Sequence, residues 1–189
     1  MLALALCSLG GPSCSSDDGR GSATAPAPPP LPIVSAAEPP REEVPLERGE
    51  VVRKKAPLIS GRTLDGRDNV AVYPGRGEVV LLHFWATWCI PCKKSMLRLD
   101  ELQKANLGKV RVIGLSVDDD PSAFAEFLAE LPVQFALAWD RNLETANRYA
   151  PKTMPATFVI DRTGTVRFEL EGFKDGDEVA LAKRVKALL

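Results

Sequence analysis

The stretch that decides the fold is Val79-Val80-Leu81-Leu82-His83-Phe84-Trp85, which Cys89-Ile90-Pro91-Cys92 follows after three further residues. A continuous apolar run broken by one histidine is typical of a strand buried on both faces, as in a parallel sheet. Pro91 suits the first turn of a helix, because a backbone N–H there would have no helical partner. We therefore predict a helix over 91–107, ending near Gly108, with both cysteines at its start.

This placement favours redox chemistry at the two cysteines. Two intervening residues at a helix N-terminus bring the sulfurs within disulfide range. The free N–H groups and the helix dipole stabilise a thiolate, so we expect the pKa of Cys89 to fall below the ordinary value of about 8.5. Cys92, one turn further along, is expected to be more buried, less acidic and able to resolve a mixed disulfide. The pair is predicted to be a redox-active disulfide that needs no other cofactor.

Two structural interpretations of the cysteine pair are weaker alternatives. Zinc usually takes four ligands, whereas this chain has four cysteines and one histidine in all, and Cys7 and Cys14 are spaced wrongly for a second pair. An inert disulfide is the other alternative, but closing so short a loop adds little stability. We therefore expect no metal at this site.

Composition divides the chain into a tail and a folded part. The formal net charge of the 189 residues is -1, and the lack of a basic excess argues against nucleic acid as a partner. Nine of the 16 prolines lie between Pro26 and Pro57, and the segment 15–55 contains no aromatic residue. Such a segment cannot bury enough apolar surface to fold. We predict a disordered, proline-rich linker over 15–55 and a folded domain over 56–189.

The first 14 residues resemble a secretion signal. The run from Met1 to Leu9 is apolar but short, and no Lys or Arg precedes Arg20. Cys14, followed by Ser-Ser-Asp-Asp and then the linker, is similar in layout to the lipidated cysteine of bacterial lipoproteins and is favoured over Cys7. A plain signal peptide or a disordered tail is the alternative. We expect an exported protein of the periplasm or cell envelope, with a lipid tether at Cys14.

Residues 56–189 alternate between predicted strands and helices. Such alternation, closed by a hairpin and a helix, predicts an α/β domain with a central mixed sheet flanked by helices. Besides the strand 79–85 and the helix 91–107, the predicted elements are a hairpin over 57–67 with an Asp-Gly turn, a strand over 110–117, a helix capped by Asp120, a strand over 135–139, a helix over 142–149, strands over 157–160 and 165–170, and a helix over 177–189.

Two segments carry a resemblance to a known family. Phe84-Trp85-Ala86-Thr87-Trp88-Cys89-Ile90-Pro91-Cys92-Lys93-Lys94 and Thr153-Met154-Pro155-Ala156-Thr157-Phe158 resemble the TlpA/ResA group of exported thiol-disulfide oxidoreductases. The resemblance covers 56–189 and implies a thioredoxin-like fold with an inserted strand–helix unit around 110–130. It also implies that Pro155 follows a cis bond and faces the disulfide, and that the Met154 backbone pairs with an extended substrate segment. The residues alone leave a trans Pro155 open, which is the commoner form.

The resemblance also suggests roles for neighbouring side chains. Trp88 is expected to shield the disulfide and to shape a docking surface together with Ile90, Pro91 and Met154. His83, where relatives carry Asp or Asn, is a candidate to take the proton of Cys92. The alternative for His83 is a buried ring that only satisfies hydrogen bonds in the sheet. Ser95 replaces a Glu found in many relatives, so their partner preference is not transferred. The run 118–120 is expected to be solvated.

By resemblance, the protein exchanges electrons with client proteins that carry cysteines or disulfides. A reductase role in cytochrome c maturation or similar reactions is expected, and in an oxidising compartment this role needs an upstream membrane thiol reductase. One alternative is a peroxidase of the peroxiredoxin type, but the Pro and Thr pattern that precedes a peroxidatic cysteine is absent. Another is a copper-delivery protein, which would need a histidine downstream of Cys92, and none follows it.

Overall fold

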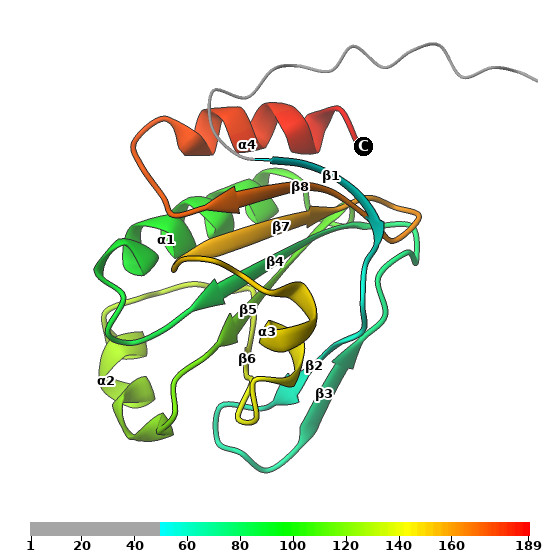
Figure 1. Cartoon of the computed structure of the whole chain (residues 1–189). Coiled ribbons are helices and arrows are strands. Elements are labelled where there is room, and N and C mark those ends of the chain that lie inside the picture. The colour runs from blue at the N-terminus through cyan, green and yellow to red at the C-terminus, as the bar shows by residue number, and fades with distance from the viewer. Residues whose placement is uncertain (1–49) are drawn as a thin grey trace, which may run out of the picture. The chain divides into compact units, whose positions relative to one another are not determined.

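The computed structural model describes residues 50–189, so the predicted signal segment 1–14, Cys14 and the linker residues 15–49 lie outside its described part. Eight strands form one sheet in the order β1-β8-β7-β4-β5-β6-β2-β3 (Figure 1). The strands are β1 (Glu50–Lys55), β2 (Ile59–Arg62), β3 (Asn69–Val72), β4 (Val79–Trp85), β5 (Val110–Ser116), β6 (Ala136–Trp139), β7 (Ala156–Ile160) and β8 (Thr165–Glu171).

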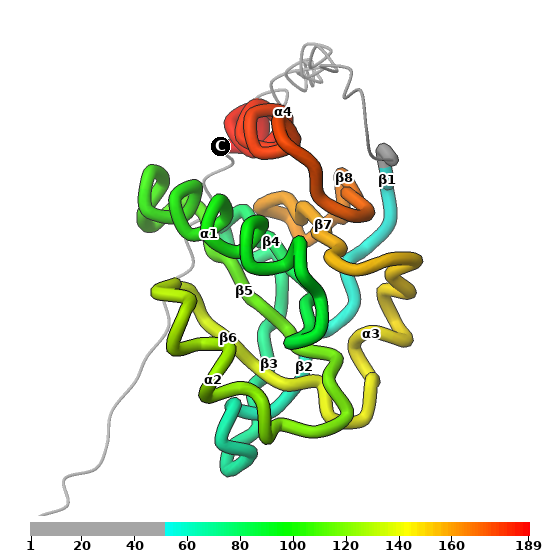
Figure 2. Tube along the Cα trace, turned by 90° about the vertical axis from the view of Figure 1, so that its left-hand side faces the viewer, coloured from blue at the N-terminus to red at the C-terminus, as the bar shows by residue number. Residues whose placement is uncertain are grey.

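Helices cover both faces of this sheet. They are α1 (Ile90–Ala105), α2 (Phe124–Ala129), α3 (Glu144–Tyr149) and α4 (Asp177–Lys186), and a 3-10 turn over Pro121–Ala123 precedes α2. Figure 2 shows α1 and α2 on one side of the strands and α3 on the other. The predicted α/β architecture, with a mixed sheet flanked by helices, is thereby confirmed. Within 50–189, no helix combines the length and the apolar character needed to cross a bilayer.

Strand β4 is the centre of the core, and its side chains alternate between the two faces. Val79, Leu81 and Trp85 pack with the buried faces of α1, α2 and α4. Val80, Leu82 and Phe84 pack on the opposite face, where α3 contributes Tyr149. All seven residues of β4 are buried, which explains its unbroken apolar sequence.

The register of β4 determines where the loops at its end meet. It pairs in parallel with β5 and antiparallel with β7. Phe84 lies opposite Ala156, the first residue of β7. Because Pro155 directly precedes Ala156, the loop before β7 and the loop after β4 lie at the same end of the sheet.

Strand β1 corrects the expected domain boundary. Residues 50–55, assigned to the linker from the sequence, pair antiparallel with β8, with Glu50 opposite Glu169 and Lys55 opposite Thr165. Arg53, Lys54 and Lys55 give the strand a charged appearance, which is typical of a sheet edge. Val52 packs against the core on the α3 side. The chain therefore enters the sheet at the end where β8 reaches Glu171, which is also the end where β7 begins.

The predicted N-terminal hairpin is present, but its second strand comes later than expected. β2 pairs with β3 from Ile59↔Val72 to Arg62↔Asn69, so the turn spans 63–68 rather than Asp65 and Gly66 alone. Asp65 Oδ1 accepts hydrogen bonds from the Thr63 hydroxyl and the Arg67 backbone N–H. These bonds stabilise a longer turn around the Asp-Gly pair.

Gly114 of β5 lets the side chains of Leu137 and Phe135 pack closely against the backbone, so we expect a larger residue at this position to be destabilising. A Cβ at this position would lie 2.6 Å from Leu137 Cδ2 and 2.9 Å from Phe135 Cε2. We predict that Gly114→Ala lowers the free energy of unfolding by about 1–3 kcal/mol, because overpacking displaces neighbouring side chains. Urea unfolding of the wild type and the variant measures this cost.

The control is Leu137→Ala, alone and combined with Gly114→Ala. Removing Cδ2 of Leu137 relieves part of the clash, so the double variant should lose less stability than the sum of the two single losses. Strictly additive losses would contradict steric crowding at Gly114.

Candidate active site

The two cysteines form a disulfide at the start of α1. Their Cα atoms are 5.4 Å apart, and Cys89 is the N-cap residue of the helix. No side chain caps the free N–H groups of the first turn, and Pro91 occupies one of the first two helical positions. Cys89 retains 4% of its exposure and Cys92 none. Cys89 is therefore the sulfur that a partner can reach, and the helix N-terminus is available to stabilise its thiolate.

A buried carboxylate fixes the loop before Cys89. Asp118 accepts hydrogen bonds from the Thr87 N–H at 3.1 Å and from the Thr87 and Ser116 hydroxyls at 2.7 Å each. Its exposure is 4%, so the expectation that the run 118–120 is solvated is wrong for Asp118. The reason is topological, since β5 runs parallel to β4 and ends beside the same loop. A carboxylate placed there is satisfied by the loop rather than by water.

A second carboxylate fixes the loop before β7. Glu171, at the end of β8, accepts hydrogen bonds from the backbone N–H groups of Lys152 and Thr153 at 2.9 and 2.8 Å. The next peptide bond, Met154–Pro155, is cis, as the resemblance implied. Within the described residues, the backbone N–H and C=O of Met154 have no hydrogen-bond partner.

His83 joins a buried chain of hydroxyl groups next to Cys92. Its Nδ1 lies 2.9 Å from Thr157 Oγ1, and its Nε2 lies 3.1 Å from Ser95 Oγ. The Ser95 hydroxyl donates to the Cys92 carbonyl at 2.9 Å. Because Ser95 has only one proton to donate, His83 Nε2 carries the proton shared with Ser95, and Nδ1 accepts from Thr157. Both ring nitrogens are therefore satisfied, and neither is directed to a sulfur.

Burial also determines the charge of His83. The ring is fully buried, and desolvation lowers its pKa from 6.5 to about 3. Its ring is therefore neutral at physiological pH. A group with this pKa is a very weak base toward a thiol, whose ordinary pKa is about 8.5. These contacts argue against the expected transfer of the Cys92 proton to His83.

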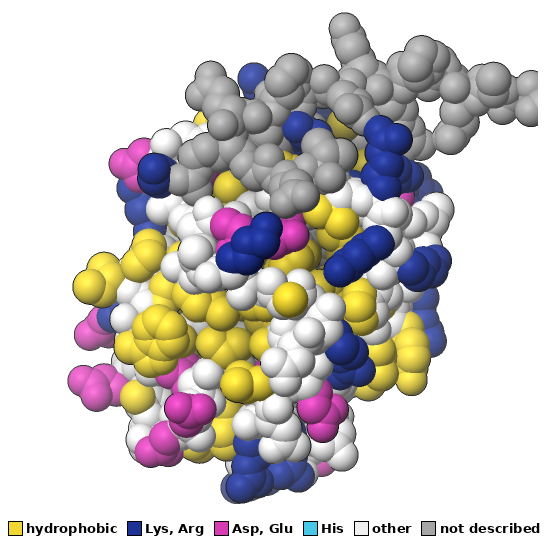
Figure 3. Space-filling model, in the orientation of Figure 1, with side chains coloured by type: hydrophobic (Ala, Val, Ile, Leu, Met, Phe, Trp, Pro, Cys, Tyr) yellow, Lys and Arg dark blue, Asp and Glu magenta, His cyan; other side chains and the backbone are white. Residues whose placement is uncertain are grey.

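An apolar surface surrounds the mouth of the disulfide. Trp88 and Ile90 are 66% and 88% exposed, Pro91 is exposed and Met154 is half-buried. In the space-filling view, hydrophobic side chains gather on the left of the face, and acidic side chains lie along their lower border (Figure 3). The four predicted docking residues are thus accessible, in contrast to the buried His83.

Lysines in the first turns of α1 are engaged by acidic partners. Lys93 pairs with Glu130, which follows α2, and Lys94 pairs with Asp175, which lies before α4. Such exposed pairs contribute little stability, but they reduce the positive charge near Cys89. Within 50–189, no group of three or more His, Cys, Asp or Glu side chains forms a candidate metal site.

Sequence reasoning missed four polar residues of the site. Ser95 and Thr157 bond His83, whereas Asp118 and Glu171 hold the two loops. Asp118 could have been found as a carboxylate at the carboxyl end of a strand parallel to β4. Glu171 gave no such signal, because its partners are backbone groups some 20 residues earlier.

Comparison with known proteins relates this chain to thiol-disulfide oxidoreductases. A model of the AhpC/TSA family matches residues 52–169. The thiol-disulfide oxidoreductase ResA of Bacillus thuringiensis subsp. konkukian is 32% identical over 122 residues, which cover 64% of this chain and 70% of that protein. ResA of Bacillus cereus matches to the same extent, with 32% identity over 122 residues.

Comparison with solved structures indicates the same relationship. A Chlorobium tepidum protein described as a thiol:disulfide interchange protein DsbE is 33% identical, with a TM-score of 0.66 over 77% of this chain and 100% of that one. A secreted Mycobacterium tuberculosis disulfide oxidoreductase, described as homologous to E. coli DsbE, is 25% identical, with a TM-score of 0.59 over 69% and 96% of the two chains. The fold is thus thioredoxin-like, and the chain belongs to the AhpC/TSA family as a thiol-disulfide oxidoreductase of the ResA and DsbE type, with Cys89 and Cys92 as its cysteine pair.

Proposed function

We propose that this oxidoreductase exchanges electrons with cysteines of client proteins, acting chiefly as a reductase. The observation that supports this most is the pairing of two features at one end of the sheet. The Cys89–Cys92 disulfide opens at the N-terminus of α1, and the unpaired backbone of Met154 lies on the loop before β7. An extended client segment can bond this backbone while its sulfur meets Cys89.

In the reducing direction, exchange takes two displacements. The Cys89 thiolate attacks a client disulfide, forms a mixed disulfide and releases one client sulfur as a thiolate. The Cys92 thiolate then attacks the Cys89 sulfur, closes the Cys89–Cys92 bond and releases the second client sulfur. Two electrons pass to the client, and solvent protonates its thiolates. The roles of Cys89 and Cys92 follow from the greater exposure of Cys89.

Pro155 and His83 take supporting roles in this proposal. Pro155 presents Met154 to the client, and its carbonyl accepts from the Gly172 N–H at 2.7 Å, which holds the loop to β8. His83 acts as a positioning residue, because it orients the Ser95 hydroxyl that bonds the Cys92 carbonyl. Trp88, Ile90 and Pro91 supply the apolar contact around the disulfide.

We further propose that the protein is exported and works in the cell envelope. The apolar segment before Cys7 and the secreted M. tuberculosis relative support export. A lipid on Cys14 would tether the domain through the proline-rich segment. An upstream membrane thiol reductase would return electrons to the disulfide, and apoprotein cysteines such as those used in cytochrome c maturation are the proposed client class.

Replacing one cysteine at a time distinguishes the two roles. We predict that Cys92→Ser accumulates mixed disulfides with clients through Cys89, because the resolving sulfur is gone. Cys89→Ser should accumulate none. Non-reducing gels of envelope fractions, followed by identification of the trapped proteins, measure the outcome.

Both variants are made with Cys7 changed to Ala, whereas Cys14 is kept for the proposed lipid, because a lipidated cysteine has no free thiol that could trap a client. Equal trapping by the two variants, or none by Cys92→Ser, would refute the assignment of Cys89 as the attacking sulfur.

The neutral state of His83 can be tested directly, because it is the only histidine in the chain. With its pKa lowered to about 3 by burial, its ring signals in the proton NMR spectrum should not titrate between pH 8 and pH 5. A titration centred near pH 6.5 would show that the ring is accessible and basic.

Stability should follow the same shift. The unfolded chain binds a proton on His83 below pH 6.5, whereas the folded chain does so only near pH 3. The contribution of neutral His83 to the free energy of unfolding is therefore fully present above pH 6.5. It is lost as the pH falls toward 3, by about 1.4 kcal/mol per pH unit. In urea unfolding, His83→Gln should show a flatter dependence over this window, and parallel curves would exclude the linkage.

Lipid attachment has its own test. We predict that the full chain, expressed in bacteria with labelled palmitate, incorporates the label and that Cys14→Ala abolishes it. Cys7→Ala should keep the label. An unlabelled wild type would end the lipoprotein proposal without affecting thiol exchange.

A further inference from the structure

A groove of about 280 Å³ lies beside the disulfide, between the loop before Cys89 and α2. Thr87 and Trp88, the two residues directly before Cys89, line one side of it. Phe127 and Glu126 of α2 line the other side. The groove is therefore continuous with the surface that a client sulfur must cross to reach Cys89.

The groove is rigidly built. Phe127 stacks on the buried Trp85 with ring centroids 5.1 Å apart and an interplanar angle of 19°. Trp85 ends β4, so this stack fixes α2 against the strand that carries the active-site loop. Asp118 holds the Thr87 side of the groove by accepting hydrogen bonds from the Thr87 backbone N–H and hydroxyl. The two walls are thus held apart without a ligand.

The charges in the groove leave one carboxylate unmatched. Lys93 and Glu130 both line the groove and pair with each other, and the Lys93 ammonium also lies 5.2 Å from the centroid of the Phe127 ring. Within the described residues, Glu126 has no cationic partner, and its side chain is exposed. The groove therefore carries a net negative charge, supplied by Glu126.

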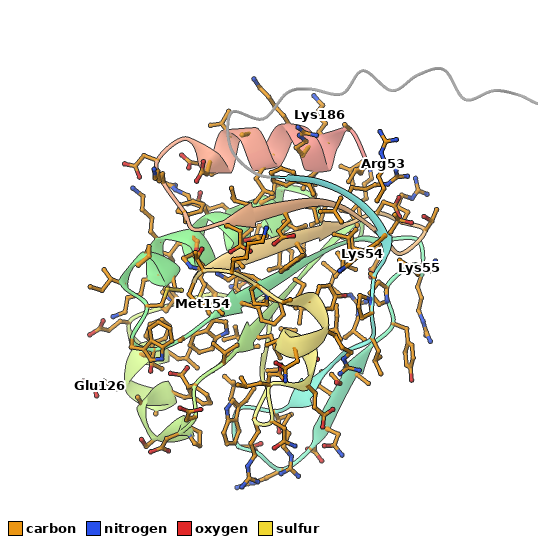
Figure 4. All side chains as sticks on the ribbon, viewed as in Figure 1. Arg53, Lys54, Lys55, Glu126, Met154 and Lys186 are labelled. Carbon is orange, nitrogen blue, oxygen red and sulfur yellow. A yellow bond between two sulfur atoms is a disulfide. The ribbon has the colours of Figure 1, made fainter. Side chains whose placement is uncertain are left out.

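The basic side chain that lines the groove, Lys93, already pairs with Glu130, and several other basic residues lie away from Glu126. Figure 4 shows Glu126 at the lower left, on the side of Met154, whereas Arg53, Lys54, Lys55 and Lys186 lie toward the top and right. The negative charge beside the disulfide is therefore locally uncompensated, and a cation from a partner can complete it.

We propose that this groove binds a basic side chain of the client, an arginine or lysine a few residues from the reacting cysteine. Glu126 supplies the opposite charge, and the exposed indole of Trp88 supplies an aromatic face for the cation. The inference rests on client exchange through Cys89 and adds a preference among clients. Glu126 determines specificity and takes no part in the transfer of electrons.

The test uses the reduced full-length protein with Cys92→Ser and with Cys7 and Cys14 changed to Ala, so that only the attack by Cys89 is observed. The probes are peptides of sequence Xaa-Ala-Cys-Ala-Xaa whose cysteine is linked to 2-thiopyridine, with Xaa as Arg, Gln or Glu. Attack by Cys89 on the peptide sulfur forms the mixed disulfide, breaks the bond to thiopyridine and releases thiopyridone, which is followed by its absorbance.

The Arg peptide should react about fivefold faster than the Gln peptide, which is the effect of an exposed ion pair near the upper end of its usual range. The Glu peptide should react more slowly than both. Glu126→Gln should remove the preference for Arg, and Glu126→Lys should reverse it. Added salt should reduce the preference in the wild-type groove, because exposed charges are screened.

Asp68→Asn is the matched control, since Asp68 is an exposed carboxylate in the turn between β2 and β3. It should keep the preference for Arg. An equal loss in Asp68→Asn and Glu126→Gln would reduce the effect to overall charge and overturn the proposal. Equal rates for the Arg and Gln peptides would also overturn it while leaving exchange through Cys89 intact. No thiopyridone release with any peptide would instead count against the proposed function.

Discussion

The site depends on the register between β4 and β7. Phe84 opposite Ala156 brings the loop before Cys89 and the loop before Pro155 to one end of the sheet. A shift of one residue would turn every side chain of β4 to the other face and move Trp85 out of the helix-covered core. The alternating packing of Val79 to Trp85 on two separate clusters opposes such a shift. The hydrophobic pattern of one strand thus fixes the geometry of the chemistry.

Charged and neutral groups are used differently around the disulfide. Two carboxylates, Asp118 and Glu171, hold the backbone of the two loops beside the disulfide by accepting hydrogen bonds from N–H and hydroxyl groups. Beneath Cys92, the polar groups are a neutral ring and two hydroxyls. This arrangement keeps net charge away from the buried sulfur, where it would be costly, and leaves the helix N-terminus to act on Cys89.

Much of the fold could be predicted because its signals are local. The apolar run 79–85, the Cys-x-x-Cys spacing and the Asp120 cap each act within a few residues, and all appear in the structure. Strand β1 could not be predicted in the same way. Its charged residues are those of a sheet edge, and β8, the strand with which it pairs, lies more than 100 residues further along the chain. The contacts of His83, Asp118 and Glu171 likewise depend on strand register, which a single sequence does not specify.

The point where β1 enters the sheet has a consequence for how the domain meets its partners. Glu50 pairs with Glu169 at the end of the sheet where β7 begins, and only β8 and β7 separate β1 from β4. Three strand spacings amount to about 14 Å. A partner protein that binds the chain just before Glu50 is therefore close to the active-site end of β4. It meets Cys89 at a raised effective concentration. With the tether proposed above, this position of β1 would favour reaction with neighbours at the anchoring surface over partners that arrive by free diffusion.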